Sequence, residues 1–168
     1  MTRNTSKTSS FKKFVHFFNE DKFRYTLGII LLLFAFYMLI SFISYFFHWE
    51  TDQDFNWDKV FSGPEITVKN QGGKWGAWIS YIFIYKWFGI ASLIFPFILL
   101  LWAFRLYKIR IFKTWALTRN GLLLVILLSV ALGLIFGSGS GFLGSGPGGS
   151  HGFHISRWMV ALMGKAGA

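Results

Sequence analysis

The sequence predicts an all-α fold, a multi-pass membrane domain with three spanning helices, an outer interfacial helix and the start of a fourth helix. Residues 25–47, 87–104 and 120–136 carry no charged side chain, and these runs are 23, 18 and 17 residues long. A hydrocarbon core about 30 Å thick takes about 17–25 helical residues to cross. The chain is also 54% hydrophobic and only 14% charged, against about 25% charged in soluble domains. We therefore expect the lipid bilayer as its first partner.

The distribution of Lys and Arg predicts how the spans are oriented. Residues 1–24 hold six of these cations and residues 105–119 hold five, whereas residues 48–74 hold three Lys and five acids. Cytoplasmic loops carry an excess of Lys and Arg. We therefore expect a cytoplasmic basic tail over 1–24, a cytoplasmic basic loop over 105–119 and an outer acidic and aromatic loop over 48–74. Contact of the basic loops with anionic lipid or DNA is a weaker alternative, because topology already accounts for them.

Residues 75–86 predict a helix that lies at the outer membrane interface and bends into the second span at about residues 87–89. The aromatic residues recur at helical spacing, and Trp and Tyr favour the headgroup level. The interfacial residues that we expect are Trp75, Trp78, Tyr85, Lys86 and Trp87. Lys86 is expected to extend toward water from the interface. The alternative is a functional charge inside the membrane. Pro96 is expected to kink the second span.

Small residues mark the third span and the segment after it. Ser129, Gly133 and Gly137 follow one another at four-residue spacing, which lets helix backbones approach closely. Residues 137–152 contain eight glycines, and we expect a flexible outer loop there. Residues 153–168 then begin a fourth helix that is too short to span.

The sequence offers no catalytic, cofactor-binding or metal-binding residue. It has no Cys, and no acid follows Glu65, so a carboxylate relay or metal site in the second and third spans is excluded. Gly139 to Gly144 matches the spacing of a dinucleotide-binding loop. That loop requires a preceding strand and an acid about 20 residues later, and neither occurs. His151 and His154 form only a weak metal candidate.

Two blocks carry a resemblance to a known family. One runs from Gly73 through GKWGAWIS and IYKWFGIAS to Pro96, and the other from Gly148 through GG, GFHIS and Trp158 to GKAG at Gly167. In order and spacing they resemble the N-terminal four-span membrane domain of FtsK/SpoIIIE DNA translocases, in its Bacteroidetes version. In that family a fourth span, a linker and an ATP-driven motor follow, so the chain looks truncated before the motor.

The resemblance implies a function that the residues alone do not show. It implies a non-catalytic membrane anchor that localises a DNA translocase to the division septum of the bacterial inner membrane. It further implies a homo-oligomer that contacts cell-division proteins, with DNA, ATP and Mg engaged only by the missing motor. The alternatives are a small transporter or channel subunit that uses Lys86 and Pro96, or a stand-alone membrane scaffold.

Overall fold

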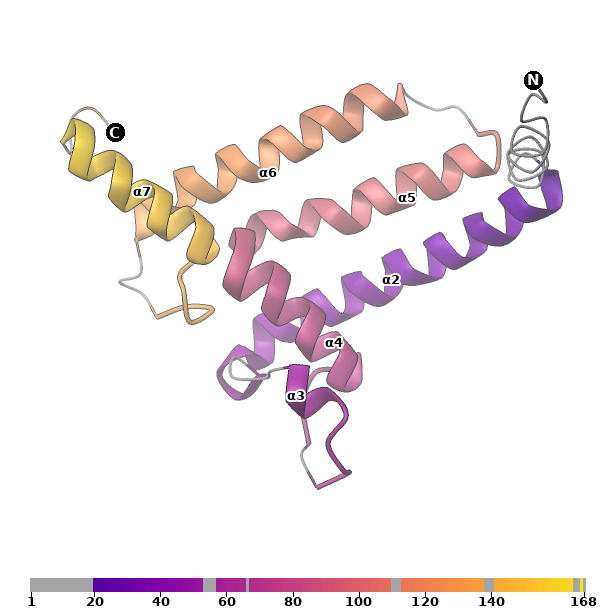
Figure 1. Cartoon of the computed structure of the whole chain (residues 1–168), viewed down its shortest axis with the longest axis horizontal. Coiled ribbons are helices and arrows are strands. Elements are labelled where there is room, and N and C mark those ends of the chain that lie inside the picture. Colours follow the sequence, from indigo (N-terminus) through magenta and orange to yellow (C-terminus); the bar gives the residue numbers. More distant parts are fainter. Residues whose placement is uncertain are drawn as a thin grey trace, which may run out of the picture.

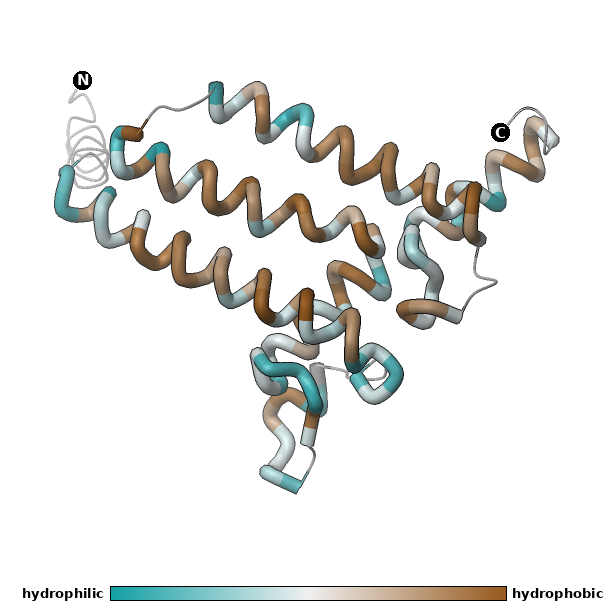
Figure 2. The backbone as a smooth tube through the Cα atoms, turned by 180° about the vertical axis from the view of Figure 1, so that it is seen from behind, coloured by the Kyte–Doolittle hydropathy of each residue, from teal (hydrophilic) through white to brown (hydrophobic). Residues whose placement is uncertain are grey.

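The fold is a single layer of three long helices, α2, α5 and α6, with α5 lying between the other two (Figures 1 and 2). This computed structural model describes residues 20–52, 57–65, 67–109, 113–137, 141–164 and 167. Residues 1–19 of the tail predicted for 1–24 therefore lie outside the described residues. The elements are α2 (Asp21–Asp52), α3 (Trp57–Val60), α4 (Gly73–Ser80), the π-helix η1 (Tyr81–Phe88), the 3₁₀-helix η2 (Gly89–Leu93), α5 (Ile94–Leu106), α6 (Thr114–Phe136) and α7 (Gly149–Met163). The described residues contain no strand, so the all-α prediction is confirmed.

Three helical stretches are long and apolar enough to cross a membrane: Asp21–Asp52, Gly73–Leu106 and Thr114–Phe136. At 1.5 Å per residue, the 32 residues of α2 extend about 48 Å and the 23 residues of α6 about 35 Å. The five residues of η2 and the 13 of α5 together extend about 30 Å, because a 3₁₀ turn rises about 2 Å per residue. Each of these lengths is therefore sufficient to cross a hydrocarbon core about 30 Å thick. Apolar residues cover the middle of the layer in Figure 2.

The helices extend beyond the charge-free runs from which they were predicted. α2 begins at Asp21 rather than at residue 25, and α6 begins at Thr114 rather than at 120. The basic loop predicted for 105–119 therefore contributes its last residues to α6, including Arg119. A charged residue does not end a helix. A charged side chain at the end of a span can extend to water while the helix continues, so the charge-free runs did not predict the helix boundaries.

The second stretch turns at Gly89, within the range 87–89 at which the sequence analysis expects the interfacial helix to bend into the span. Gly89 ends η1 with φ 62° and ψ −136°, a conformation that glycine adopts without strain. In Figure 1, α4 crosses the layer at a steep angle, and α5 then runs alongside α2. Pro96 lies in the first turn of α5, where backbone N–H groups lack an intrahelical partner in any case. A proline at this position therefore does not require a kink.

The predicted flexible loop over 137–152 is corrected by the structure. Within the described part of this segment, Leu143 is completely buried and packs in the core with Met38, Phe42 and Ile84. The fourth helix, expected from residue 153, begins already at Gly149. Composition suggested a linker because glycine-rich chains are flexible when nothing binds them. Here the backbone instead packs against η1, η2 and α6.

The outer segment 67–72 runs back along the end of α2 and is held by polar side chains. Asn70 donates from Nδ2 to the Ser41 carbonyl (3.0 Å), and the Ser44 hydroxyl accepts from the backbone N–H of Gln71 (2.9 Å). Tyr37 donates its hydroxyl to the Gly72 carbonyl at 2.7 Å. This segment therefore satisfies its backbone groups on α2. Together with α3 it forms the lobe that protrudes below the layer in Figure 1.

Candidate functional site: the glycine junction

The closest backbone packing lies where η1, η2, α6 and α7 meet, and we call this region the glycine junction. Its core residues are Gly89, Ser129, Gly133, Gly148, Gly149 and Gly152. Among the described residues no group of three or more His, Cys, Asp or Glu side chains could hold a metal ion. What the junction shows is close packing of helix backbones.

Helix α7 rests on α6 through glycines on both sides. A Cβ added to Gly133 would lie 2.5 Å from the carbonyl carbon of Gly152, and one added to Gly148 would lie 2.8 Å from the Gly133 nitrogen. Real Cβ atoms essentially never approach closer than 3.0 Å. The Ser129 hydroxyl donates to the Gly148 carbonyl at 2.7 Å, and both groups are buried. Backbone meets backbone here, which is the packing mode that small residues allow between membrane helices.

The glycine-rich segment also supplies hydrogen-bond partners for backbone groups of η1 and η2. Its Pro147 carbonyl accepts from the Ile90 N–H at 2.9 Å, and its Ser145 hydroxyl donates to the Tyr85 carbonyl at 2.7 Å. Ser92 donates to the Phe83 carbonyl within the same turn. A π-helix followed by a 3₁₀ turn leaves carbonyl groups without regular helical partners. The Ser145 hydroxyl and the Pro147 carbonyl of the glycine-rich segment, together with the Ser92 hydroxyl of η2 itself, therefore satisfy backbone groups at the bend.

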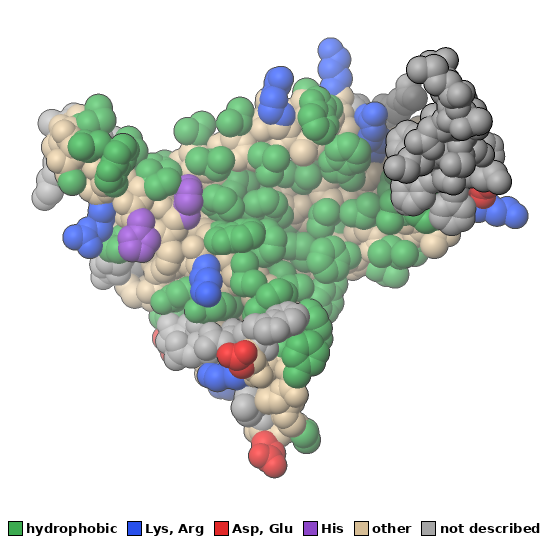
Figure 3. Space-filling model, viewed as in Figure 1, with side chains coloured by type: hydrophobic (Ala, Val, Ile, Leu, Met, Phe, Trp, Pro, Cys, Tyr) green, Lys and Arg blue, Asp and Glu red, His purple; other side chains and the backbone are tan. Residues whose placement is uncertain are grey.

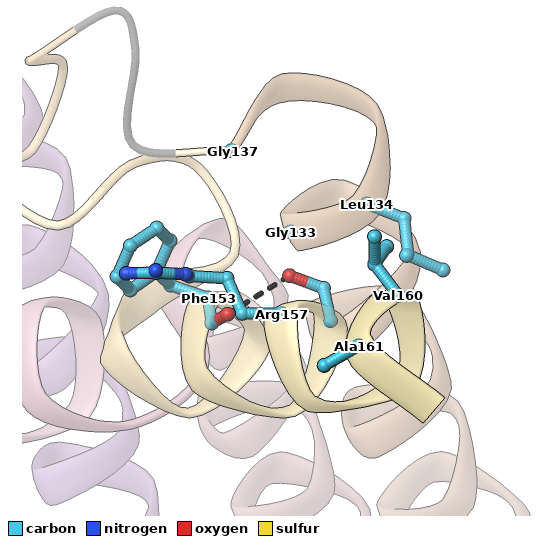
Figure 4. Close-up of a pocket in the computed structure, with 8 residues that line it drawn as sticks. Gly133, Leu134, Gly137, Phe153, Arg157, Val160 and Ala161 are labelled. Atoms are coloured by element: carbon cyan, nitrogen blue, oxygen red, sulfur yellow. Dashed lines mark hydrogen bonds between the residues drawn. The ribbon is translucent and has the colours of Figure 1, made fainter. Parts of the chain in front are cut away.

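A groove of about 370 Å³ lies beside the junction, between α6 and α7 (Figure 4). It exists because Gly133 and Gly137 place no side chain there. Arg157 lies at this groove with its guanidinium over the Phe153 ring, 5.5 Å from the centroid. The remaining lining residues are Leu134, Ser156, Val160 and Ala161. The walls are mostly apolar, and the Ser156 hydroxyl is already bonded to the Phe153 carbonyl at 2.9 Å.

The structure brings together the predicted small residues of the third span. Ser129 and Gly133 face α7, and Gly137 ends α6 with φ 56° at the rim of the groove. The sequence analysis missed their partners, Gly148 and Gly152. These two glycines are also four residues apart, which is the signal that would have found them. Gly89 and Gly149 gave no such signal, because their partners lie far away in the sequence.

The predicted interfacial residues do not form one site. Trp75 and Trp78 meet edge to face at 5.9 Å on α4, where Phe61 joins Trp75. Lys86 is exposed, and its Nζ lies 5.3 Å from the centre of the Tyr81 ring. Nothing around Lys86 favours the transporter alternative over a lysine that extends toward water.

Among the described carboxylates, that of Asp52 at the end of α2 is buried. It lies past the kink at His48 (φ −128°, ψ 19°), beyond the apolar part of α2. Its Oδ1 accepts from the Lys69 N–H at 3.2 Å, whereas Oδ2 has no hydrogen-bond partner among the described residues. Burial raises the pKa of Asp52 above the usual 3.8, and the Lys69 N–H offsets that rise only in part.

Comparison with known proteins decides the family. The family described as the 4TM region of DNA translocase FtsK/SpoIIIE matches residues 21–168, which is most of the chain. The chain belongs to this family. No curated protein and no solved structure matches it. The resemblance drawn from the Gly73 and Gly148 blocks is thereby confirmed.

The residues of the glycine junction fall within the matched part of the 4TM region. Both blocks that carried the resemblance lie at this junction or next to it. The first contributes η1 and η2, and the second contributes the start of α7. Four glycines of these blocks are therefore positions at which backbones of this 4TM region touch: Gly89, Gly148, Gly149 and Gly152.

Proposed function

We propose that this chain is the membrane anchor of a DNA translocase that acts in cell division and chromosome segregation. The observation that carries the proposal is the match of residues 21–168 to the membrane region of such translocases. Three helical stretches fit a bilayer, and the glycine junction offers a fixed arrangement of helices rather than a reaction. ATP, Mg and DNA would be engaged by a motor that these residues do not contain. The place of action that we propose is the septum of a bacterial inner membrane.

Charge supports an orientation with the N-terminus in the cytoplasm. The start of α2, the end of α5 and the start of α6 lie at one end of the layer (Figure 1), and they carry most of the described cations. Four of the six described acids lie instead at the far end of α2 or in the lobe that follows it, whereas two lie at the cationic end (Figure 3). Because Lys and Arg are retained on the cytoplasmic side, a phosphatase fused after Ser62 should be active and one fused after Lys108 inactive. The reverse pattern would contradict this orientation.

A homo-oligomer and contacts with other division proteins complete the proposal. The outer lobe is suited to protein contacts, because Phe61 is 70% exposed and lies against Trp75, which is itself 47% exposed. Two exposed aromatic rings in contact are typical of interface anchors. Single-molecule mass measurement in lipid nanodiscs would give the subunit number, and a strictly monomeric population would refute the oligomer.

The localisation experiment tests the anchor role directly. A fluorescent protein fused to the N-terminus of the full chain should concentrate at the septum of dividing bacterial cells. The matched control is Gly133→Leu, which keeps the hydrophobicity of α6 and should insert, but disrupts the glycine junction. Septal enrichment of the wild type and an even membrane signal for the control would support an anchor whose helix arrangement matters. An even signal for the wild type would refute septal anchoring.

A further inference from the structure

Six cations are gathered at one end of the helical layer, and we call them the cationic edge. The edge consists of Lys22, Arg24, Arg105, Lys108, Lys113 and Arg119. Blue side chains along the upper and right-hand margin of Figure 3 belong to it. The described acids at this end are Glu20 and Asp21, and the sequence has no acid after Glu65. The edge therefore keeps a strong net positive charge.

Two contacts hold the cations from the three helices in one row. Tyr107, after α5, stacks on Tyr25 of α2 with ring centres 5.8 Å apart and lies against Gly28. Trp102 of α5 donates from Nε1 to the Thr118 hydroxyl of α6 at 3.0 Å. The first contact joins the start of α2 to the end of α5, and the second joins α5 to α6. The packing of the three helices therefore brings the positive charges together.

Most of this charge is not neutralised within the described protein. Lys108 forms an ion pair with Asp21 at 2.8 Å. No described carboxylate pairs with Arg105, Lys113 or Arg119, and all three side chains are exposed. Arg105 lies 5.7 Å from the Trp102 ring centre, a contact that supports the side chain but leaves its charge and donors available.

The edge also lies at the depth of lipid headgroups. Directly inside it along α6, residues 120–136 carry no charge, and on the same helix Trp115 is 70% exposed. Trp at the end of a span favours the headgroup region. Cations at this level face the phosphate groups of the leaflet, and a juxtamembrane Lys or Arg interacts favourably with an anionic leaflet.

We propose that the cationic edge binds the headgroups of anionic phospholipids, so that this 4TM region is preferentially surrounded by such lipids at that end. The inference goes beyond anchoring, because a span needs only hydrocarbon and is indifferent to headgroup charge. Each engaged cation contributes about 1 kcal/mol at an anionic surface, equal to about a fivefold change in association. The edge is exposed, so added salt weakens the preference.

The test measures how strongly spin-labelled phosphatidylglycerol and phosphatidylcholine associate with the full chain in vesicles. Electron paramagnetic resonance reports the fraction of each lipid held at the protein, and the ratio of the two is the selectivity. We expect a wild-type selectivity of several-fold for phosphatidylglycerol that falls toward one in high salt. The triple variant Arg105→Gln, Lys113→Gln, Arg119→Gln should likewise lower the selectivity toward one at low salt. A wild-type ratio of one would overturn the proposal.

A matched triple variant separates position from total charge. Lys69→Gln, Lys86→Gln, Arg157→Gln removes three exposed cations elsewhere and should leave the selectivity unchanged. The conservative pair Lys113→Arg, Arg119→Lys should retain it, which excludes loss of folding as the cause. An equal loss in both triple variants would overturn the proposal. So would an edge variant that weakens binding of a DNA duplex to the solubilised chain while lipid selectivity stays the same.

Discussion

Adding one methyl group at Gly133 is the sharpest test of the glycine junction. The new Cβ would lie 2.5 Å from the carbonyl carbon of Gly152 and 3.0 Å from the nitrogen of Phe153, whereas ordinary contact begins at 3.4 Å. Both neighbours are backbone atoms of α7, so no side chain can rotate away. Helix α7 must therefore move by about 1 Å in a close-packed region. Overpacking of this kind costs about 1–3 kcal/mol, and we expect Gly133→Ala to lower the free energy of unfolding by that amount.

Gly121→Ala is the matched control, because it adds the same methyl group to the same helix. Its Cβ would meet Ile98 Cδ1 at 3.2 Å, the far end of a flexible side chain. Unfolding in mixed micelles with increasing dodecyl sulfate gives the free energies. The chain has no Cys, so spin labels on cysteines introduced at Ile135 and Leu162, both exposed, report the distance between α6 and α7. If Gly133→Ala and Gly121→Ala gave the same free energy and the same distance, close contact of the two backbones would be refuted.

Three further predictions concern positions outside that contact. Because burial raises the pKa of Asp52, its ionisation destabilises the fold as the pH rises from about 3.8 through the raised value. Asp52→Asn should therefore be more stable than the wild type at neutral pH and equal to it below pH 3.8; equal stability at neutral pH would contradict this. Lys108 has φ 63° at the end of α5, a strain of about 1–2 kcal/mol, and the exposed ion pair with Asp21 is weaker than this strain. Lys108→Gly should therefore raise the unfolding free energy by about 1 kcal/mol. Leu143→Ala should lower it by about 2–5 kcal/mol, since Leu143 is completely buried, whereas a solvated linker would show no change.

The sequence predicts the parts of the fold that the bilayer determines. Charge-free runs such as 120–136 had to become spans, because hydrocarbon thickness sets the length of a helix that crosses it. The four-residue spacing of Ser129, Gly133 and Gly137 marked the face of α6 that packs, although not its partner. The bend at Gly89 lies in the range 87–89 where the sequence analysis expects it. The further kink expected at Pro96 is not required, because Pro96 lies in the first turn of α5. What the sequence did not show is which backbone lies beside Gly89.

Glycine content alone does not distinguish a flexible linker from a close-packed segment, and the residues between the glycines do. A linker has no use for a large apolar side chain, yet Leu143 lies within this glycine-rich run and is buried in the core. Gly148 and Gly152 also keep the helical spacing that a solvated coil would not require. Glycine allows another backbone to approach closely, but it also raises the conformational entropy of the unfolded chain. Its net effect on stability therefore depends on whether a partner backbone is present. In this 4TM region α6 and η2 provide that partner, so the glycine-rich segment is closely packed against them.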